Sequence, residues 1–378
     1  MRTKDRLLLG GICCLILGLG LVGYNWLERG NPQAAAGDIG IKPSQAANSS
    51  PIPMLAYYYI WFDSNSWDRA KTDYPLAGRY TSDDRAVMRR QIQWAKAAGI
   101  EGFIVSWKSS DVLNRRLEQL VDLAEEENFK LVVIYQGLDF NRDPLAVEKV
   151  ASDLDVFIQR FADRPAFQLF SKPLVIWSGT WKFSAEEIGQ VTQSRRSKIL
   201  LLASERTADD YNRLASLVDG NAYYWSSVNP ETFPGYQAKL IDMGQAVHQN
   251  GGLWIAPAAP GFDARLVGGT SVVERKNGQT LRDEINAAQA SSPDALGIIS
   301  WNEFSENSQI EPSEVYGTKY LKILSDINHL PIQTFGEFDS SEPAGIFPEV
   351  LPGSRAMALG GLVITILAGA IIIARRQI

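Results

Sequence analysis

Cysteine and histidine are almost missing from this 378-residue chain, which has two of each. Both cysteines, Cys13 and Cys14, lie inside an uncharged apolar run, so the remainder of the chain can form no internal disulfide and must depend on its core for stability. The two histidines, His248 and His329, are not part of any metal-ligand spacing. The sequence therefore predicts neither a disulfide-rich domain nor a metal centre.

Motifs of several other enzyme classes are absent as well. No Gly-x-Gly-x-x-Gly follows the first predicted strand, so dinucleotide binding has no support. No Gly-x-Ser-x-Gly and no cysteine–histidine arrangement supports acyl transfer. The net charge of −6 argues against a nucleic-acid partner. We therefore expect a protein that uses no cofactor and binds no nucleic acid.

Long uncharged apolar runs occur near both ends of the chain. The run 7–27 follows three basic residues, and the run 356–374 precedes two arginines. Each is long enough to cross a bilayer as a helix, and the positive-inside rule places the basic flanks in the cytoplasm. We predict two transmembrane helices in the plasma membrane, the first acting as a signal anchor. A cleaved signal peptide is the alternative for the first run, because residues 34–36 are small enough for a peptidase.

The predicted organisation places one folded domain between these runs, outside the cytoplasm. Residues 28–52 are rich in Asn, Pro, Gln, Ala, Gly and Ser and are expected to form a flexible stalk. The folded domain occupies residues 53–335, and a linker at 336–355 leads to the second apolar run. The short ends 1–6 and 375–378 are the predicted cytoplasmic tails.

The predicted domain repeats a short apolar strand, a polar turn and an amphipathic helix eight times. The expected strands are 54–62, 100–107, 130–135, 173–177, 198–203, 220–225, 252–256 and 296–301. The expected helices are 83–98, 114–127, 144–161, 185–193, 208–217, 236–248, 281–290 and 318–327. This rhythm is typical of a closed (β/α)8 barrel of the TIM type, in the α/β class, with an open doubly wound sheet as the main alternative.

The segment 296–312 changes abruptly from an apolar strand to a dense polar run. Glu303 and Glu306 are three residues apart and follow Trp301. One such carboxyl can donate a proton while the other stays ionised, and aromatic rings can stack on a sugar. The plainer alternative is that both glutamates are solvated loop residues or cap the next helix.

Aromatic residues recur where the other predicted strands end. They are Trp61, Trp107, Tyr135, Trp177, Tyr224 and Trp225. A single tryptophan at such a position is more often a core residue, but a ring of them around paired carboxylates favours a sugar-binding groove. Because active sites of such barrels form where the strands end, we expect Trp61, Trp107, Tyr224 and Glu303 to converge in one pocket.

These residues resemble those of glycoside hydrolase family 99, the endo-α-mannosidases and endo-α-mannanases. The similar motifs are Tyr58-Tyr59-Ile-Trp61, the loop Leu76 to Asp84, Ser106-Trp107, Arg164-Pro-Ala-Phe167, Asp219-Gly220 with Tyr224, Pro260-Gly-Phe262 and Arg275-Lys-Asn277-Gly278. The most specific is Asn302-Glu-Phe-Ser-Glu-Asn-Ser-Gln-Ile-Glu311, which looks like the family's Asn-Glu-Trp-His-Glu-Gly-Thr-Gln-Ile-Glu. The resemblance covers nearly the whole predicted domain.

The resemblance implies roles for individual residues. Glu303 would be the base that helps the substrate's own 2-hydroxyl attack the anomeric carbon, and Glu306 the acid that protonates the leaving oxygen and later activates water. This is a retaining route without a covalent enzyme intermediate. The substrate-binding residues that it implies are Tyr59, Trp61, Trp107, Tyr224, Arg275, Asn277, Asn302 and Gln309. The expected partner is an α-linked, mannose-like oligosaccharide or polysaccharide.

Two departures from the family pattern bear on specificity. Phe304 and Ser305 replace Trp and His beside the acid. The family's third-strand His-Ile-Glu-Pro-Tyr aligns with residues 135–139, which places Gly137 where a substrate-binding glutamate is expected. This loss favours a non-catalytic carbohydrate-binding or envelope polysaccharide assembly protein, whereas the intact glutamate pair favours a hydrolase. A glycan-transferring enzyme with an acceptor sugar in place of water is a third hypothesis.

The membrane topology is open to test by reporter fusions. A reporter that is active only in the cytoplasm should work at either terminus and fail within residues 53–335, because the basic flanks of both apolar runs stay inside. Cytoplasmic activity of a reporter within the folded domain would contradict the prediction. A mature chain that begins near Gly37 would remove the first of the two membrane helices.

Overall fold

The computed structural model describes residues 52–331. Its main sheet contains eight parallel strands. They are β1 (Met54–Tyr59), β2 (Gly102–Trp107), β3 (Lys130–Gln136), β4 (Leu174–Ser178), β5 (Leu200–Leu202), β6 (Gly220–Ala222), β7 (Leu253–Ala258) and β10 (Ala295–Ile298). The order in the sheet is β5-β4-β3-β2-β1-β10-β7-β6.

A bridge between the two edge strands closes this sheet. Ala203, just after β5, forms a parallel bridge with Asn221 of β6, and the Ala222 amide donates to the Ala203 carbonyl at 2.9 Å. The predicted barrel is therefore confirmed, and the open doubly wound alternative is wrong.

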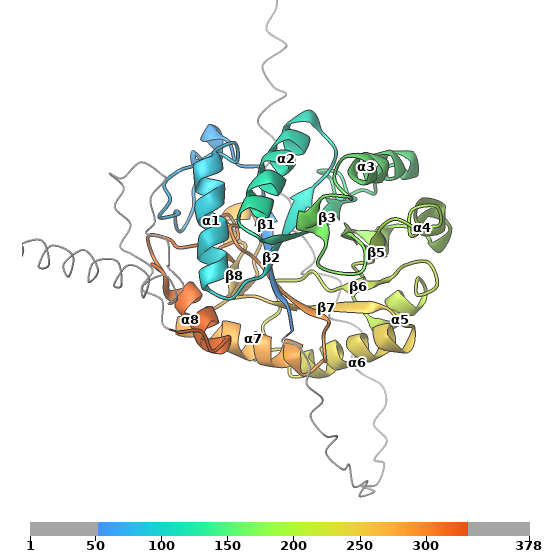
Figure 1. The fold of residues 1–378 in the computed structure, drawn as a ribbon. Helices are drawn as coiled ribbons and strands as arrows, with labels where there is room; N and C mark the ends of the chain where they lie inside the picture. Colours follow the sequence, from blue (N-terminus) through green and yellow to red (C-terminus); the bar gives the residue numbers. More distant parts are fainter. Residues whose placement is uncertain (1–51, 332–378) are drawn as a thin grey trace, which may run out of the picture. The chain divides into compact units, whose positions relative to one another are not determined.

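Eight helices alternate with the strands of the barrel in the described part of the chain. They are α1 (Arg85–Ala97), α2 (Asp111–Glu126), α3 (Val147–Arg160), α4 (Ala185–Thr192), α5 (Ala208–Asn212), α6 (Tyr236–Gln249), α7 (Gln279–Gln289) and α8 (Lys319–Ile327). Figure 1 shows them arranged around the strands. The predicted helix boundaries agree with the observed ones to within three residues, except that α5 ends at Asn212 instead of Leu217.

The remaining predicted segments lie outside the described residues. They are the tails, the stalk, the linker and both apolar runs. Within residues 52–331, no helix is both long enough and apolar enough to span a membrane.

Alternate strand residues point into and out of the barrel, as the pleat of a β-strand requires. Along β2, Ile104 packs with Val132 in the barrel interior, whereas Phe103 and Val105 belong to the layer that the helices cover. Because both faces are covered, the strands are nearly continuous apolar runs rather than alternating ones. This explains why the sequence located them but did not show which residues face inward.

Three strands end three residues earlier than predicted at the carboxyl edge of the barrel. β1 ends at Tyr59 rather than Phe62, β6 at Ala222 rather than Trp225, and β10 at Ile298 rather than Trp301. Several of the residues beyond these ends are buried although they have left the sheet, so their composition does not distinguish them from strand. A small antiparallel pair, β8 (Phe262–Asp263) with β9 (Val272–Val273), was not predicted.

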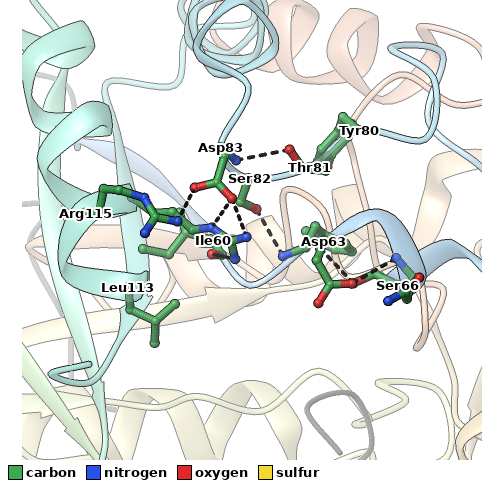
Figure 2. Close-up of polar contacts among 12 residues, drawn as sticks. Ile60, Asp63, Ser66, Tyr80, Thr81, Ser82, Asp83, Leu113 and Arg115 are labelled. Carbon is green, nitrogen blue, oxygen red and sulfur yellow. Dashed lines mark hydrogen bonds and ion pairs between the residues drawn. The ribbon is translucent and has the colours of Figure 1, made fainter. Parts of the chain in front are cut away.

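The long connection 60–84 between β1 and α1 is tied to α2 at both of its ends. The Asp83 carboxylate accepts from Arg115 at 2.8 Å and from Arg116 at 2.7 Å. Arg116 also donates to the Ile60 carbonyl at 3.0 Å. Figure 2 shows Asp83 facing Arg115, with Ile60 close by. The connection is thereby held over the carboxyl edge of the barrel.

The two arginines that share Asp83 should differ in their contribution to stability. The Arg116 side chain is 7% exposed and the Arg115 side chain 54%. Arg116→Leu should therefore lower the free energy of unfolding by about 2–3 kcal/mol, because it leaves the Ile60 carbonyl and half of the Asp83 carboxylate without a partner. Arg115→Leu, the matched control, should change it by less than about 1 kcal/mol. Urea denaturation measures both; equal losses would contradict the anchoring role of Arg116.

Candidate active site

Glu303 and Glu306 lie on one tight loop that follows β10. The loop is closed at its base, where the Ser300 amide donates to the Ser308 carbonyl at 2.8 Å and the Ile310 amide donates to the Ser300 carbonyl at 2.9 Å. Residues 304–307 form a turn between these bonds. The two glutamates are 6% and 4% exposed, so they are neither solvated loop residues nor caps of the next helix.

Asn302 extends the β1–β10 ladder with its side chain after β10 has ended. Its Oδ1 accepts from the Tyr59 amide at 2.9 Å, and its Nδ2 donates to the Tyr59 carbonyl at 3.1 Å. A side-chain amide thus makes both hydrogen bonds that a strand residue would make. These bonds, and a third to the Tyr80 hydroxyl at 3.3 Å, hold the Asn302 amide within the protein; its contact with substrate stays a prediction.

The surroundings of Glu303 partly favour its ionised form. Burial raises the pKa of the Glu303 carboxyl, while a hydrogen bond from the Ser305 amide at 3.0 Å and the nearby charge of Lys71 lower it. Lys71 itself donates to the Ser305 hydroxyl at 3.1 Å. Hydrogen bonds and an opposite charge stabilise a carboxylate. Glu303 is therefore suited to accept a proton.

Glu306 has a more strongly raised pKa than Glu303. Burial is the main cause, the charge of Glu303 adds to it, and Arg142 opposes it. The backbone of Glu306 is held by the Asp263 amide of β8, which donates to the Glu306 carbonyl at 2.7 Å. A carboxyl whose pKa is raised in this way is suited to donate a proton.

Three predicted sugar-contacting aromatics meet beside the two carboxyls. The rings of Tyr59 and Trp61 stack with centroids 4.3 Å apart, and the hydroxyls of Tyr59 and Tyr224 are hydrogen-bonded. Burial raises the pKa of both tyrosines, and the charges of Glu303 and Glu306 raise both further. These aromatics and the glutamates therefore share one site at the carboxyl edge of the barrel.

A sequence model of a known family covers most of this chain. The model described as glycosyl hydrolase family 99 matches residues 22–333. This chain belongs to glycosyl hydrolase family 99. The family predicted from the motifs is thereby confirmed.

Relatives in this family include curated proteins of animals. The glycoprotein endo-alpha-1,2-mannosidase of Mus musculus is 22% identical over 285 residues, which cover 67% of this chain and 60% of that protein. The protein of the same name from Rattus norvegicus is 24% identical over 286 residues, with the same coverage of 67% and 60%. The chain thus spans about 60% of the length of these relatives.

Solved structures show the same fold. The GH99 endo-alpha-mannosidase from Bacteroides thetaiotaomicron superposes with a TM-score of 0.65 at 19% identity, over 74% of this chain and 98% of that one. A glycoside hydrolase-like protein superposes with a TM-score of 0.57 at 16% identity, over 76% and 97% of the two chains. Likeness at this level of identity supports the barrel and does not identify a substrate.

Gly137 marks where this family 99 member departs from the family pattern. It follows β3, and its amide donates to the Ser178 carbonyl of β4 at 3.2 Å. A Cβ at this position would lie 2.3 Å from the Trp177 indole nitrogen and 2.6 Å from the Ser178 carbonyl oxygen. Since real side chains do not approach so closely, the expected glutamate has no room here. The absence of a glutamate at position 137 is therefore tied to the close packing of β3 against β4.

Trp107 does not reach the carboxyls, contrary to the expectation. It is 1% exposed, its ring lies 6.0 Å from that of Phe157 on α3, and its indole nitrogen donates to Asn114 of α2 at 3.0 Å. It therefore packs between β2 and the helices, on the same side of the strand as Val105. Alternation along the strand explains the error, because only every second residue faces inward.

Three further predicted substrate-binding residues make contacts within the protein. Arg275 is buried and donates to the carbonyls of Asn307 and Gln309, both at 2.9 Å. The Gln309 side chain donates to Asp73 at 3.0 Å, and Asn277 is exposed and accepts from Lys319 at 2.7 Å. Arg275 therefore supplies donors that the buried carbonyls of the loop need, and Gln309 ties the loop to the connection 60–84 through Asp73. Asn277 lies outside the site.

Glu311 closes the same loop through a buried hydrogen-bond network. Its two carboxyl oxygens accept from Tyr80 at 2.9 Å and from Gln91 at 2.7 Å, and Gln91 in turn accepts from Tyr58 at 2.5 Å. Burial raises the pKa of Glu311 to about 8. The residue therefore orients the loop, in a neutral form at pH 7.

The sequence did not identify Lys71 and Arg142 as members of the site. Lys71 lies in the polar connection 60–84, and Arg142 in the β3–α3 connection, where no periodic pattern distinguishes one basic residue from another. Their position after a strand of the barrel is the only signal that could have found them. Among residues 52–331, no three or more His, Cys, Asp or Glu side chains are grouped to hold a metal ion.

The pKa of Glu311 predicts how stability depends on pH. Because this pKa is about 8 in the folded chain against 4.5 for an ordinary glutamate, the unfolded chain loses its proton first, and the Glu311 contribution falls as pH rises from about 4.5 to about 8. Glu311→Gln removes this penalty. Between pH 5.5 and 7.5 the mutant should gain about 2 kcal/mol over the wild type in the free energy of unfolding. Denaturant titrations of both proteins at pH 5.5 and 7.5 measure this gain. A difference in the free energy of unfolding between mutant and wild type that is the same at both pH values would refute the prediction.

Proposed function

We propose that this protein is a retaining glycoside hydrolase that cleaves α-linked, mannose-containing glycans, with Glu303 as base and Glu306 as general acid and base. One observation supports this assignment above all others. Burial raises the pKa of both neighbouring carboxyls, but Ser305 and Lys71 oppose that rise at Glu303, whereas the charge of Glu303 adds to it at Glu306. Paired carboxyls whose pKa values are separated in this way are suited to divide acid and base roles.

The proposed first step breaks the glycosidic bond with the help of the substrate's own 2-hydroxyl. The Glu303 carboxylate takes the proton of that hydroxyl, whose oxygen attacks the anomeric carbon and closes a three-membered ring. Glu306 gives its proton to the departing oxygen. In the second step Glu306, now ionised, takes a proton from water, the water oxygen opens the ring at the anomeric carbon, and Glu303 returns its proton to the 2-oxygen. Two inversions at one carbon give net retention.

The stacked aromatics supply the proposed binding surface for the sugar. Trp61 and Tyr224 are only half-buried, so part of each ring remains open to a ligand, and both are linked through Tyr59 to the site of the two glutamates. Aromatic rings contribute favourable contacts to the apolar faces of sugars. Mannose is proposed because the curated relatives are named as endo-alpha-1,2-mannosidases.

The cellular setting is part of the proposal. The two apolar runs and their basic flanks support a domain that is tethered to the plasma membrane and acts outside the cytoplasm. A surface glycan or an extracellular polysaccharide would then be within reach of the barrel.

Replacing each catalytic carboxyl should abolish most of the activity without unfolding the chain. Glu303→Gln and Glu306→Gln should each lower kcat by at least about a hundredfold, the usual effect of losing a general acid or base. Glu314→Gln is the matched control, because Glu314 is an exposed residue following the same loop and should leave kcat unchanged. With an activated leaving group that needs no protonation, Glu306→Gln should recover part of its rate and Glu303→Gln should not.

The pH profile gives an independent measurement. Since the raised pKa of Glu306 keeps the acid protonated, kcat/KM should fall at alkaline pH as Glu306 loses its proton, and at acidic pH as Glu303 gains one. The alkaline limb should disappear for Glu306→Gln with the activated substrate. Unchanged hydrolysis in both mutants would refute the assignment, and a wild-type protein that binds α-mannosides but never cleaves them would favour the carbohydrate-binding alternative.

A further inference from the structure

A second cluster of aromatic and basic side chains lies at the carboxyl edge of the barrel, outside the catalytic loop. Arg206 follows β5, Trp181 follows β4, and Trp225 follows β6. The guanidinium carbon of Arg206 lies 4.2 Å from the ring centroid of Trp181 and 4.8 Å from that of Trp225. Three consecutive strands of the barrel therefore place one arginine over two indole rings.

The charge of Arg206 is only partly balanced within the described residues, since the charges of Glu205 and Asp210 act on it without bonding to it. In residues 52–331 Arg206 forms no hydrogen bond or ion pair, and its Nε is buried without a partner. The nearest acids are bound to other groups: Glu205 pairs with Arg213 at 3.2 Å, and Asp210 accepts from Thr207 at 2.7 Å. Burial lowers the pKa of Arg206, and the positive charge of Arg142 lowers it further.

The cluster is continuous with the catalytic site. Trp225 directly follows Tyr224, whose hydroxyl is bonded to Tyr59 beside the glutamates. The charge of Arg142 acts on both Glu306 and Arg206, so Arg142 lies within electrostatic range of both. The cluster therefore lies near enough to Glu306 for the charge of one residue to act on both.

An anion satisfies such a group better than a neutral ligand does. Keeping a half-buried cation without a counter-charge costs free energy, which a hydroxyl group offsets only in part. Indole faces fix the plane of a guanidinium, and its N–H donors then point along that plane in a fork that matches two oxygens of a carboxylate or phosphate.

We propose that Arg206, Trp181 and Trp225 form a subsite for a sugar unit that carries a carboxylate or a phosphate, so that the glycan substrate is anionic. This inference rests on the proposed function, which it extends by naming the substrate class. The subsite binds a unit next to the one that is cleaved and does not take part in bond breaking.

The test compares three α-mannosyl oligosaccharides of equal length on the purified full-length protein. One is neutral, one carries a phosphate on a unit that is not cleaved, and one has a uronic acid at that unit. The wild type should show a kcat/KM at least tenfold higher for an anionic substrate than for the neutral one, mainly through a lower KM. The better of the two anionic substrates identifies the charged group.

Variants of Arg206 should remove this preference. In Arg206→Gln and Arg206→Leu the ratio of anionic to neutral kcat/KM should fall at least tenfold, while thermal unfolding checks that the fold is kept. Arg160→Leu is the matched control, because Arg160 at the end of α3 also lies over an aromatic ring, that of Phe161 at 5.2 Å, but pairs with Glu118 at 2.9 Å on the outer helices. The ratio of anionic to neutral kcat/KM in Arg160→Leu should equal that of the wild type.

Binding to Glu306→Gln separates this inference from the proposed function. Calorimetry with this variant should give at least tenfold tighter binding of an anionic oligosaccharide than of the neutral one, whether or not the wild type cleaves either. Equal affinities, or a preference that persists in the Glu306→Gln, Arg206→Gln double variant, would overturn the subsite. Charge-selective binding without any cleavage by the wild type would overturn the hydrolase proposal alone.

Discussion

The paired hydrogen bonds between the Asn302 side chain and the Tyr59 backbone are the constraint on which the site depends. The β1–β10 ladder pairs Ala56 with Ile298 and then ends. The Trp301 amide still donates to the Tyr57 carbonyl at 2.7 Å, but the amide and carbonyl of Tyr59 lie beyond the ladder in a buried place. Asn302 satisfies both at 2.9 and 3.1 Å. The same bonds fix the position of the residue immediately before Glu303. The hydrogen bonds that satisfy the Tyr59 backbone therefore also position Glu303.

The two glutamates are tuned by different parts of the chain. Lys71 comes from the β1–α1 connection and acts on Glu303, whereas Arg142 comes from the β3–α3 connection and acts on Glu306. Each glutamate therefore has a basic neighbour of its own, although the two share a single loop and the charge of Glu303 also acts on Glu306. The turn of that loop brings their charges together, and each neighbouring connection then modifies one of them.

The fold and the buried position of Glu303 and Glu306 beyond the end of a strand were predictable from the sequence because their signals are local. Strands covered on both faces are short apolar runs, and Glu303 and Glu306 follow such a run with fixed spacing. The face of β2 on which Trp107 lies depends on the alternation of side chains along the strand, and the bonds of Asn302 depend on the register between strands. Composition shows neither. Lys71 bonds to Ser305, which is 234 residues away in the chain. A contact of that separation exists only after the barrel has closed.

The contact of Gly137 with Trp177 restricts how this protein can change in evolution. Restoring the family's glutamate by one substitution would force a side chain into the indole ring and the Ser178 carbonyl, at 2.3 and 2.6 Å from its Cβ. The intermediate would lose stability before it gained a new sugar contact. A smaller residue at position 177 would remove only the first of these contacts and would leave a cavity in the core beside Phe183. A glutamate at position 137 is thus opposed by a side chain and by a backbone carbonyl together, so no single compensating substitution makes room for it.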